Sequence, residues 1–381
     1  MGIQFRLGAG DHKPVEDFLA RGVAGTTAIC LDTKAARYQA DAAAAAVEAG
    51  LHVFWEPATE RLAAEGYGLD RYPLWAGKPY DIDTLATRDV DRRVLVERTI
   101  ERHPQGTTHF TPPHFYVTND RSAHLNIDLA ERTLLQAGDT PVRAVLTISN
   151  QVRSRLTIDL AQEYAAAGVT MVEVRLSPFG GDDESLRKIR SGFAFLDSFR
   201  ERGIHTTLGL SGNVGETALA IGHADAFSVG LGVLERVDHA GVVARLRREP
   251  DPEKDRGGAP GGVYLPRLAA TVPRAAAEAL LRNTDIRTRI GCRIGTCRHS
   301  ITGPLDDRRS HYLHARDDEV GALLARPRSW RGAMEVDRLT EAIQLRDRVN
   351  EHYLGGSVHE LKTRTLHSLI DEIHEQQRKA S

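Results

Sequence analysis

The sequence predicts an α/β protein, namely a (β/α)8 TIM-like barrel followed by a C-terminal Cys/His-containing subdomain and closing helices. Three observations support this fold class. Short apolar runs alternate with longer amphipathic segments, the turns between them are short, and the alternation continues to about residue 235. Strands and helices that alternate in this way indicate parallel strands joined by helical crossovers.

Eight apolar runs have the length and composition of strands. In chain order they are residues 3–8, 26–32, 52–57, 114–120, 142–149, 169–177, 205–212 and 225–232. Residues 155–168 and 183–203 have the apolar spacing of amphipathic helices, and 40–50 is an alanine-rich helix. Because eight strands are what a (β/α)8 barrel needs, residues 1–247 are assigned to the barrel.

The pattern changes after residue 247. Residues 248–262 are rich in proline, glycine and charge, which is typical of a solvated linker or insertion loop. Residues 263–381 contain two of the three cysteines and several helical patterns, and they are predicted to form a C-terminal helical subdomain with a zinc site.

Composition narrows the class of protein. The 381 residues are 41% hydrophobic and 27% charged, which is ordinary for a soluble globular protein. No apolar run approaches the roughly 18 residues that span a bilayer, and the first residues have no apolar signal segment. Three cysteines do not form a disulfide framework, so we expect a cytoplasmic protein without a membrane partner. A net charge of −2 leaves only a local basic face to attract nucleic acid.

Polar residues follow four of the predicted strands. They are Glu56, Asp120, the pair Asn150 and Gln151, and Ser177. In a barrel these strand ends converge on one mouth, where carboxylates and amides can bind a small polar ligand. The alternative is that each one caps a helix, since Asp, Asn and Ser are good N-caps. Their occurrence after four strands favours a site.

Glycine-rich turns lie in residues 209–232, around Gly212. Such turns can place backbone N–H groups around an anion, as in the phosphate sites of barrels. They are equally typical of tight turns between strands and helices.

Cys292 and Cys297 are separated by four residues, and His299, His311 and His314 follow them closely. Two thiolates and two imidazoles can complete a tetrahedral zinc site. This spacing is not that of the common zinc knuckle, so structural thiols remain the alternative. Cys30, in an apolar strand, is predicted to be a core thiol.

Several of these stretches fall into one familiar order. Residues 144–189, 207–232, 292–297 and 311–349 resemble the central barrel, last two strands, zinc subdomain and closing helices of the tRNA-guanine transglycosylases. The resemblance covers roughly residues 110 to 350 and rests on order and spacing.

The resemblance implies a TIM barrel with a zinc-bearing insertion. It also implies exchange of a guanine in nucleic acid for a 7-deazaguanine through a covalent aspartate–ribose intermediate, and a bacterial branch of the family acts on DNA. One carboxylate then serves as the nucleophile at C1′ and a second as the acid/base. Family members commonly pair through the zinc region, so the resemblance also implies a homodimer.

The family's roles can be carried over to matching positions. Asp120 matches the base-recognising aspartate, Asn150 and Gln151 match the amide turn, and the loop from Ser177 through Gly180 and Gly181 matches the substrate loop. Glu56 lies where the acid/base aspartate is expected.

Two positions depart from the family pattern. Ser228 occupies the place of the nucleophilic aspartate, and the nearest carboxylates along the chain are Glu216 and Glu235. Ile294 occupies the place of the middle zinc cysteine, and the distant zinc histidine is missing from the stretch 326–330.

The sequence therefore predicts a transglycosylase-like protein that binds a purine or 7-deazaguanine base or nucleotide at the barrel mouth and exchanges a base in tRNA or DNA. The predicted site residues are catalytic Glu56 and Ser228, substrate-binding Asp120, Asn150, Gln151, Ser177, Gly180, Gly181 and Gly212, and zinc-binding Cys292, Cys297, His299 and His314. No organic cofactor is expected. Two alternatives stay open: a non-catalytic nucleic-acid-binding subunit, and a barrel enzyme for a small phosphorylated metabolite.

Overall fold

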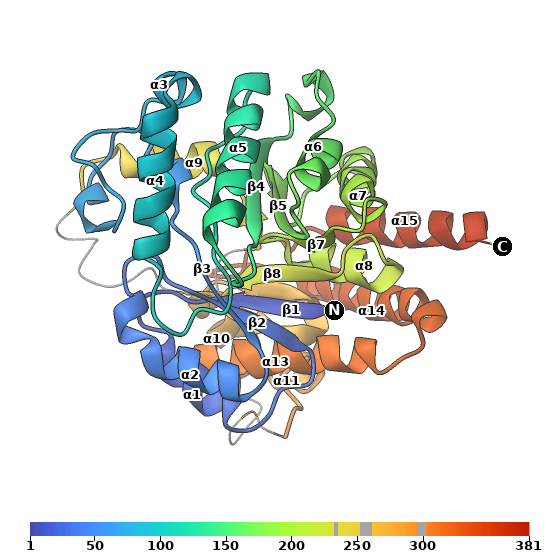
Figure 1. The fold of residues 1–381 in the computed structure, drawn as a ribbon. Coiled ribbons are helices and arrows are strands. Elements are labelled where there is room, and N and C mark those ends of the chain that lie inside the picture. The colour runs from blue at the N-terminus through green and yellow to red at the C-terminus, as the bar shows by residue number, and fades with distance from the viewer. Residues whose placement is uncertain (232–234, 252–260, 296, 298–301, 381) are drawn as a thin grey trace.

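The computed structural model describes residues 1–231, 235–251, 261–295, 297 and 302–380. Seven parallel strands form one curled sheet, with helices on its outer face (Figure 1). The strand order is β3-β2-β1-β8-β7-β5-β4. The strands are β1 (Gly2–Arg6), β2 (Thr26–Leu31), β3 (His52–Trp55), β4 (Ala144–Ser149), β5 (Met171–Ser177), β7 (His205–Leu208) and β8 (Ala226–Gly230).

The sheet is a half-barrel and not a closed eight-stranded barrel. The predicted strand at residues 114–120 is wrong, because the stretch from residue 108 to 117 makes only isolated bridges. Phe110 and Val117 bridge to residues next to and within β4, and the Thr108 N–H donates to the Val53 carbonyl of β3 (2.9 Å). This stretch therefore lies between the two edge strands without completing the ladder.

The backbone groups of this stretch are used elsewhere. Pro112 and Pro113 have no N–H to donate to a ladder. The N–H of His114 donates to the Thr59 hydroxyl (2.8 Å), and the N–H of Phe115 donates to the Asn126 side chain (2.8 Å). Side chains thus replace the strand partner at this position.

Helices cover the outer face of the sheet, and an outlying group, α3 to α5, rises beside β4 (Figure 1). The helices of the first part are α1 (His12–Leu19), α2 (Ala40–Glu48), α3 (Ile82–Thr87), α4 (Asp89–Glu101), α5 (Asp120–Gln136), α6 (Leu160–Ala166), α7 (Leu186–Arg200), α8 (Gly212–Ile221) and α9 (His239–Leu246). Asn119 caps α5 in a reciprocal capping box with Ser122, which explains why a helix and not a strand begins there.

Side chains alternate between the two faces of a strand, and this alternation determines which side chains point into the barrel. In β5, Val172, Val174 and Leu176 belong to the outer hydrophobic cluster with the helices. Side chains alternate along a strand, so Glu173 and Arg175 point to the opposite, inner face. The barrel interior is accordingly charged, and it carries the candidate site described below.

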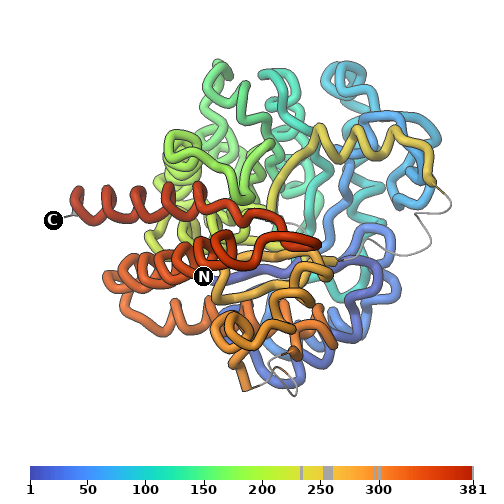
Figure 2. The backbone as a smooth tube through the Cα atoms, turned by 180° about the vertical axis from the view of Figure 1, so that it is seen from behind, coloured from blue at the N-terminus to red at the C-terminus, as the bar shows by residue number. Residues whose placement is uncertain are grey.

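The C-terminal part packs directly on the barrel. Its helices are α10 (Arg274–Arg282), α11 (Thr284–Ile290), α12 (Gly303–Asp306), α13 (Arg308–Leu324), α14 (Arg328–His352) and α15 (Arg364–Ala380), and β10 (Val263–Leu265) pairs with β11 (Ala270–Val272). Tyr312 and Leu313 of α13 share a hydrophobic cluster with Ile3 and Phe5 of β1, and Leu339 of α14 joins the cluster around β5. Helices α14 and α15 run side by side, and the end of α15 extends beyond the body (Figure 2). Among the described residues, no helix combines the length and apolarity that a membrane span requires.

Candidate functional site

A buried ion network occupies the mouth of the half-barrel, where β1, β3 and β5 end. Glu56, which follows β3, is fully buried and forms ion pairs with Arg6 and Arg175. Arg175 also donates to the other oxygen of Glu56 (Nη1 to Oε1, 2.5 Å) and to Glu173 (Nε to Oε1, 2.6 Å). Burial alone would raise the pKa of the Glu56 carboxyl, but the two guanidiniums outweigh it and hold that pKa well below its usual range.

His114 lies between two carboxylates of this network. Its Nδ1 donates to the Pro112 carbonyl (3.2 Å), and its Nε2 is 3.3 Å from Glu60 Oε2 and 3.6 Å from Glu56 Oε1. Burial would lower the pKa of His114, but the two glutamates raise it to about 9. Burial would likewise raise the pKa of Glu60, but His114 lowers it to about 2.

The donor atoms of Glu56, Glu60 and His114 lie within 4.8 Å of one another, close enough to bind a cation. Arg6 and Arg175 already neutralise Glu56, so a divalent ion would meet two guanidiniums at short range. The arrangement therefore fits a proton on His114 better than a metal ion.

Ser228 lies deeper in the barrel than the ends of the strands. Its side chain is 1% exposed, its oxygen accepts from the Leu210 N–H (3.0 Å), and its hydroxyl donates to Glu173 Oε1 (3.3 Å). Both of its hydrogen-bonding roles are thus satisfied within the protein. Below it, burial lowers the pKa of Arg143 to about 9, and this guanidinium pairs with Glu173.

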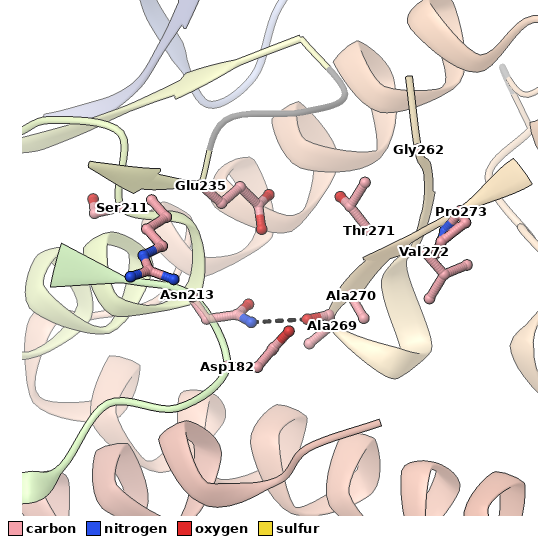
Figure 3. Close-up of a pocket in the computed structure, with 12 residues that line it drawn as sticks. Asp182, Ser211, Asn213, Glu235, Gly262, Ala269, Ala270, Thr271, Val272 and Pro273 are labelled. Atoms are coloured by element: carbon pink, nitrogen blue, oxygen red, sulfur yellow. Dashed lines mark hydrogen bonds between the residues drawn. The ribbon is translucent and has the colours of Figure 1, made fainter. Parts of the chain in front are cut away.

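A pocket of about 350 Å³ opens beside the mouth (Figure 3). Four segments contribute to it: the turn after β6 (Phe179–Gly180), the start of α8, the residues that lead into β9 (Arg236–Val237), and the β10–β11 hairpin. Its lining comprises Gly181, Asp182, Ser211, Asn213, Glu235, Arg236, Gly262, Ala269, Ala270, Thr271, Val272 and Pro273. We call it the side pocket.

The polar groups of the side pocket are held by the surrounding structure. Asn213 donates to the Ala269 carbonyl (2.8 Å), which fixes the start of α8 to the hairpin (Figure 3). Asp182 accepts from Arg346 through one oxygen (3.0 Å). The Thr271 hydroxyl is buried, has no hydrogen-bond partner within the described chain and lies on the side of its residue that faces Glu235 (Figure 3).

Glu235 is the partly exposed end of a second charged cluster. Tyr312 donates to Glu235 (2.8 Å), and Arg316 pairs with both Glu235 and Glu216. Four carboxylates share two guanidiniums in this cluster, which comprises Glu216, Glu235, Glu319, Glu335, Arg316 and Arg338. Burial raises the pKa of Glu216 to about 8, which relieves part of the negative surplus by protonation.

Two of the glycines predicted to bind substrate lie in close contact with Glu235. Gly180 has a φ of +93°, and a Cβ there would lie 2.7 Å from the Glu235 carbonyl oxygen. Gly212 has a φ of +48°, and a Cβ there would lie 2.8 Å from the Glu235 Cβ. Glycine at both positions lets residue 235 approach the barrel closely, and Gly181 lines the side pocket itself.

The other residues that were predicted to bind substrate do not line the side pocket together. Asp120 begins α5 and accepts from the Thr157 N–H (3.0 Å) and hydroxyl (2.6 Å), so it fixes a loop and does not line the side pocket. The Asn150 N–H donates to the Ser177 carbonyl (2.8 Å), and Gln151 is exposed.

Ser177, in turn, is buried at the end of β5, and its oxygen accepts from the His239 N–H (2.9 Å). This contact holds the start of α9 over the mouth, where His239 stacks on Tyr116 with 4.2 Å between ring centroids.

A cluster of cysteines and histidines lies between the end of α11 and α13. The donor atoms of Cys292, Cys297, His311 and His314 all lie within 4.8 Å of one another, with His311 Nδ1 3.3 Å from Cys297 Sγ. His311 Nε2 is 2.7 Å from the Tyr264 carbonyl and donates to it, which leaves the Nδ1 lone pair facing the thiols. The hydrogen bond from the Cys297 thiol is the largest influence on Cys292 and lowers its pKa, which favours the thiolate that binds metals. His299 lies outside the described residues.

Sequence reasoning missed the arginines of the mouth and the side chain of His114. A signal was present: Glu173 and Arg175 are two apart in an otherwise apolar strand, as are Gln4 and Arg6. Polar side chains at this period indicate one shared face, and here that face is the barrel interior.

Neither a family model nor a curated protein matches the sequence. Among solved structures, the chain is similar to the carboxyl transferase domain of Rhizobium etli pyruvate carboxylase, in a variant form with pyruvate and in a form with pyruvate and biocytin. The identity is 10% in both, and the TM-scores are 0.36 and 0.35. The alignments cover 100% and 98% of this chain but 62% and 61% of those chains, so this chain spans about three fifths of their length. A likeness of this degree carries no assignment of activity.

Proposed function

We propose that the protein binds a purine-like base, such as guanine or a 7-deazaguanine, in the side pocket and exchanges that base in tRNA or DNA. The observation that supports this proposal is the polar lining of the pocket. Asp182 and Glu235 offer carboxylate oxygens, Arg236 offers N–H donors, and the buried Thr271 hydroxyl has no hydrogen-bond partner among the described residues. A guanine edge presents two N–H donors beside a carbonyl, which complements this set of groups.

The charge of the pocket argues against a phosphate at the same place. Asp182 and Glu235 contribute two carboxylates, and the cluster behind Glu235 carries more carboxylates than guanidiniums. An anion there would be repelled, whereas a neutral heterocycle with N–H donors would not. A small phosphorylated metabolite is therefore a poorer ligand for this pocket than a base.

In base exchange, a carboxylate attacks C1′ of the sugar as the bond to the outgoing base breaks, and the incoming base reverses this step. We assign the nucleophile to Glu235, because its carboxylate lines the pocket and is positioned there by its ion pair with Arg316. Glu56 and Ser228 are engaged inside the barrel and support this region structurally. Base binding without exchange is the second candidate, favoured by the burial of Ser228 at the expected nucleophile position.

Replacing Asp182 by asparagine is expected to weaken guanine binding by about tenfold, since one hydrogen bond to a charged acceptor contributes about 1.5–3 kcal/mol. Asp182 is half-exposed, so this variant should fold normally, and Glu235→Gln should weaken binding at least as much. Isothermal titration calorimetry with the free base measures both variants. The exposed carboxylate of Glu97 on α4 supplies the control Glu97→Gln, which should bind as the wild type does.

Incorporation of labelled guanine into bulk tRNA or DNA measures exchange separately from binding. Wild type should incorporate label, Glu235→Gln should not, and Ser228→Ala should remain active. If no label enters either polymer while the free base still binds, the exchange step is contradicted and the binding function stands.

We further propose that Cys292, Cys297, His311 and His314 hold a zinc ion. Two thiols and two imidazoles are a common donor set for structural zinc, and the hydrogen bond from His311 to Tyr264 orients its ring as such sites require. Zinc bound there would join the end of α11 to α13.

Elemental analysis of the purified protein should find one zinc per chain. Cys297→Ser and His311→Ala should each remove it, because three ligands hold zinc far less firmly than four. Cys30→Ser is the matched control, since Cys30 is a buried thiol in β2 and should leave the zinc content unchanged. Full zinc content in both ligand variants would contradict the assignment.

A further inference from the structure

A second cavity, of about 780 Å³, lies at the ends of β2 and β3. Its walls come from the turn after β2, from Trp55 at the end of β3, from the segment around Arg71, and from the residues that follow α4. The lining residues are Thr33, Lys34, Ala36, Arg37, Ala40, Trp55, Arg71, Pro73, Arg102, Pro104 and Gln105. We call it the basic groove.

The charge of the basic groove is of one sign. Lys34, Arg37, Arg71 and Arg102 are all exposed, and no carboxylate is among the lining residues. Within the described part of the chain, none of these four cations forms an ion pair, although Arg37 donates to the Tyr38 hydroxyl.

Two arginines of the neighbouring α5 differ from these four. Arg121 pairs with Asp83, and Arg132 pairs with Asp89 and Asp128. The basic groove therefore gathers four cations without an ion pair in a chain whose net charge is −2.

We propose that the basic groove binds consecutive phosphates of a single-stranded nucleic acid. Its four cations come from three segments around a volume more than twice that of the side pocket, which suits an extended polyanion better than one phosphate. Tyr38, 61% exposed and stacked on Arg37 at 4.5 Å, offers a face on which a base can stack.

An anionic membrane fits the groove less well. Surfaces that bind bilayers combine basic residues with large apolar side chains that insert among the lipids. The lining supplies only alanine, proline and the buried Trp55 as apolar groups.

This inference rests on the proposed function, since it names the contact through which a polymer would present its base. The groove lies at the carboxyl ends of β2 and β3, and the side pocket lies near the carboxyl ends of β7 and β8. Parallel strands share one carboxyl edge, so both sites are on the same face of the sheet, with β1 between β2 and β8.

The test compares two variants of the full chain with equal net charge. The groove variant combines K34Q, R37Q, R71Q and R102Q, and the control variant combines R88Q, R121Q, R282Q and R378Q, whose arginines are 59–82% exposed outside the groove. Fluorescence anisotropy measures binding of an oligothymidylate and an oligouridylate of about 20 nucleotides between about 50 and 200 mM salt.

Wild type and the control variant should bind with a slope of log K against log salt of about −2 to −3, since each neutralised phosphate of a single strand contributes about −0.7. The groove variant should bind at least about tenfold more weakly at the lower salt, with a slope near zero. Equal weakening in both variants, or binding to phosphatidylserine vesicles but to neither oligonucleotide, would overturn the inference.

The same variants distinguish a loss of strand binding in the basic groove from a loss of guanine binding in the side pocket. The groove variant should bind free guanine as the wild type does, whereas Asp182→Asn should keep the salt-dependent binding of the strand. Strand binding that is lost in Asp182→Asn and kept in the groove variant would assign the polymer to the side pocket and refute the groove.

Discussion

Replacing Glu56 by glutamine is expected to lower the free energy of unfolding by about 3–5 kcal/mol. The carboxylate of Glu56 is fully buried and pairs with both Arg6 and Arg175. Glutamine keeps the size of the side chain but removes the charge, so Arg6, Arg175 and His114 each lose one charged partner in a largely buried site. Urea unfolding at neutral pH, followed by circular dichroism, measures the loss.

Glu97→Gln is the control for this variant. Glu97 is half-exposed on α4 and lies 3.8 Å from Arg93, and a surface pair of this kind contributes little to stability. A double variant, Glu56→Leu with Arg175→Met, should lose less stability than the sum of its two single variants, because partners removed together leave fewer unpaired charges. A loss below about 1 kcal/mol in Glu56→Gln would contradict a network that depends on this carboxylate.

Most of the sheet could be predicted because apolar runs bounded by turns are a local signal. Seven of the eight predicted strands are confirmed, and their starts differ from the observed strands by no more than two residues. The run at 205–212 was predicted too long, since its last residue, Gly212, already begins α8. Gly212 reads as part of the strand pattern, but its positive φ and its contact with Glu235 depend on a residue 23 positions further along the chain.

The missing eighth strand has the same explanation. Residues 114–117 are apolar and aromatic, as in a strand, but Thr59 and Asn126 take up the N–H groups of His114 and Phe115. Competition from side chains that are distant in sequence is invisible in a local pattern.

The candidate site could be predicted only in part, and for a related reason. Glu56 is recognisable because it follows an apolar run, Glu235 only as a carboxylate near Ser228 in the sequence, and Cys292 and Cys297 because cysteines are rare in this chain. Their partners could not be predicted, since Arg175 reaches Glu56 across 119 positions and Arg316 reaches Glu235 across 81. His311 was one of three nearby histidines in the sequence, and only the fold shows that its ring is oriented by Tyr264.

The stability that His114 contributes is expected to depend on pH. Its pKa is about 9 in the folded protein, against 6.5 for an ordinary histidine, because Glu56 and Glu60 favour the imidazolium. The folded state therefore binds this proton more tightly than the unfolded chain. The contribution is complete below about pH 6.5 and is lost as the pH rises through about 9, and the difference corresponds to about 3 kcal/mol.

The stability difference between wild type and His114→Gln isolates this contribution, because the other titrating groups are common to both proteins. The stability contributed by some of these groups has the opposite pH dependence. Burial lowers the pKa of His103 and His109 to about 4, so their contribution to stability is lost as the pH falls below about 6.5. Urea unfolding at a series of pH values should show the difference shrinking by about 3 kcal/mol between about pH 6.5 and 9. His124→Gln, at an exposed position on α5, is the matched control variant. A constant difference for His114→Gln would mean that His114 is neutral in the folded protein, and the charge balance of the mouth would then rest on Arg6 and Arg175 alone.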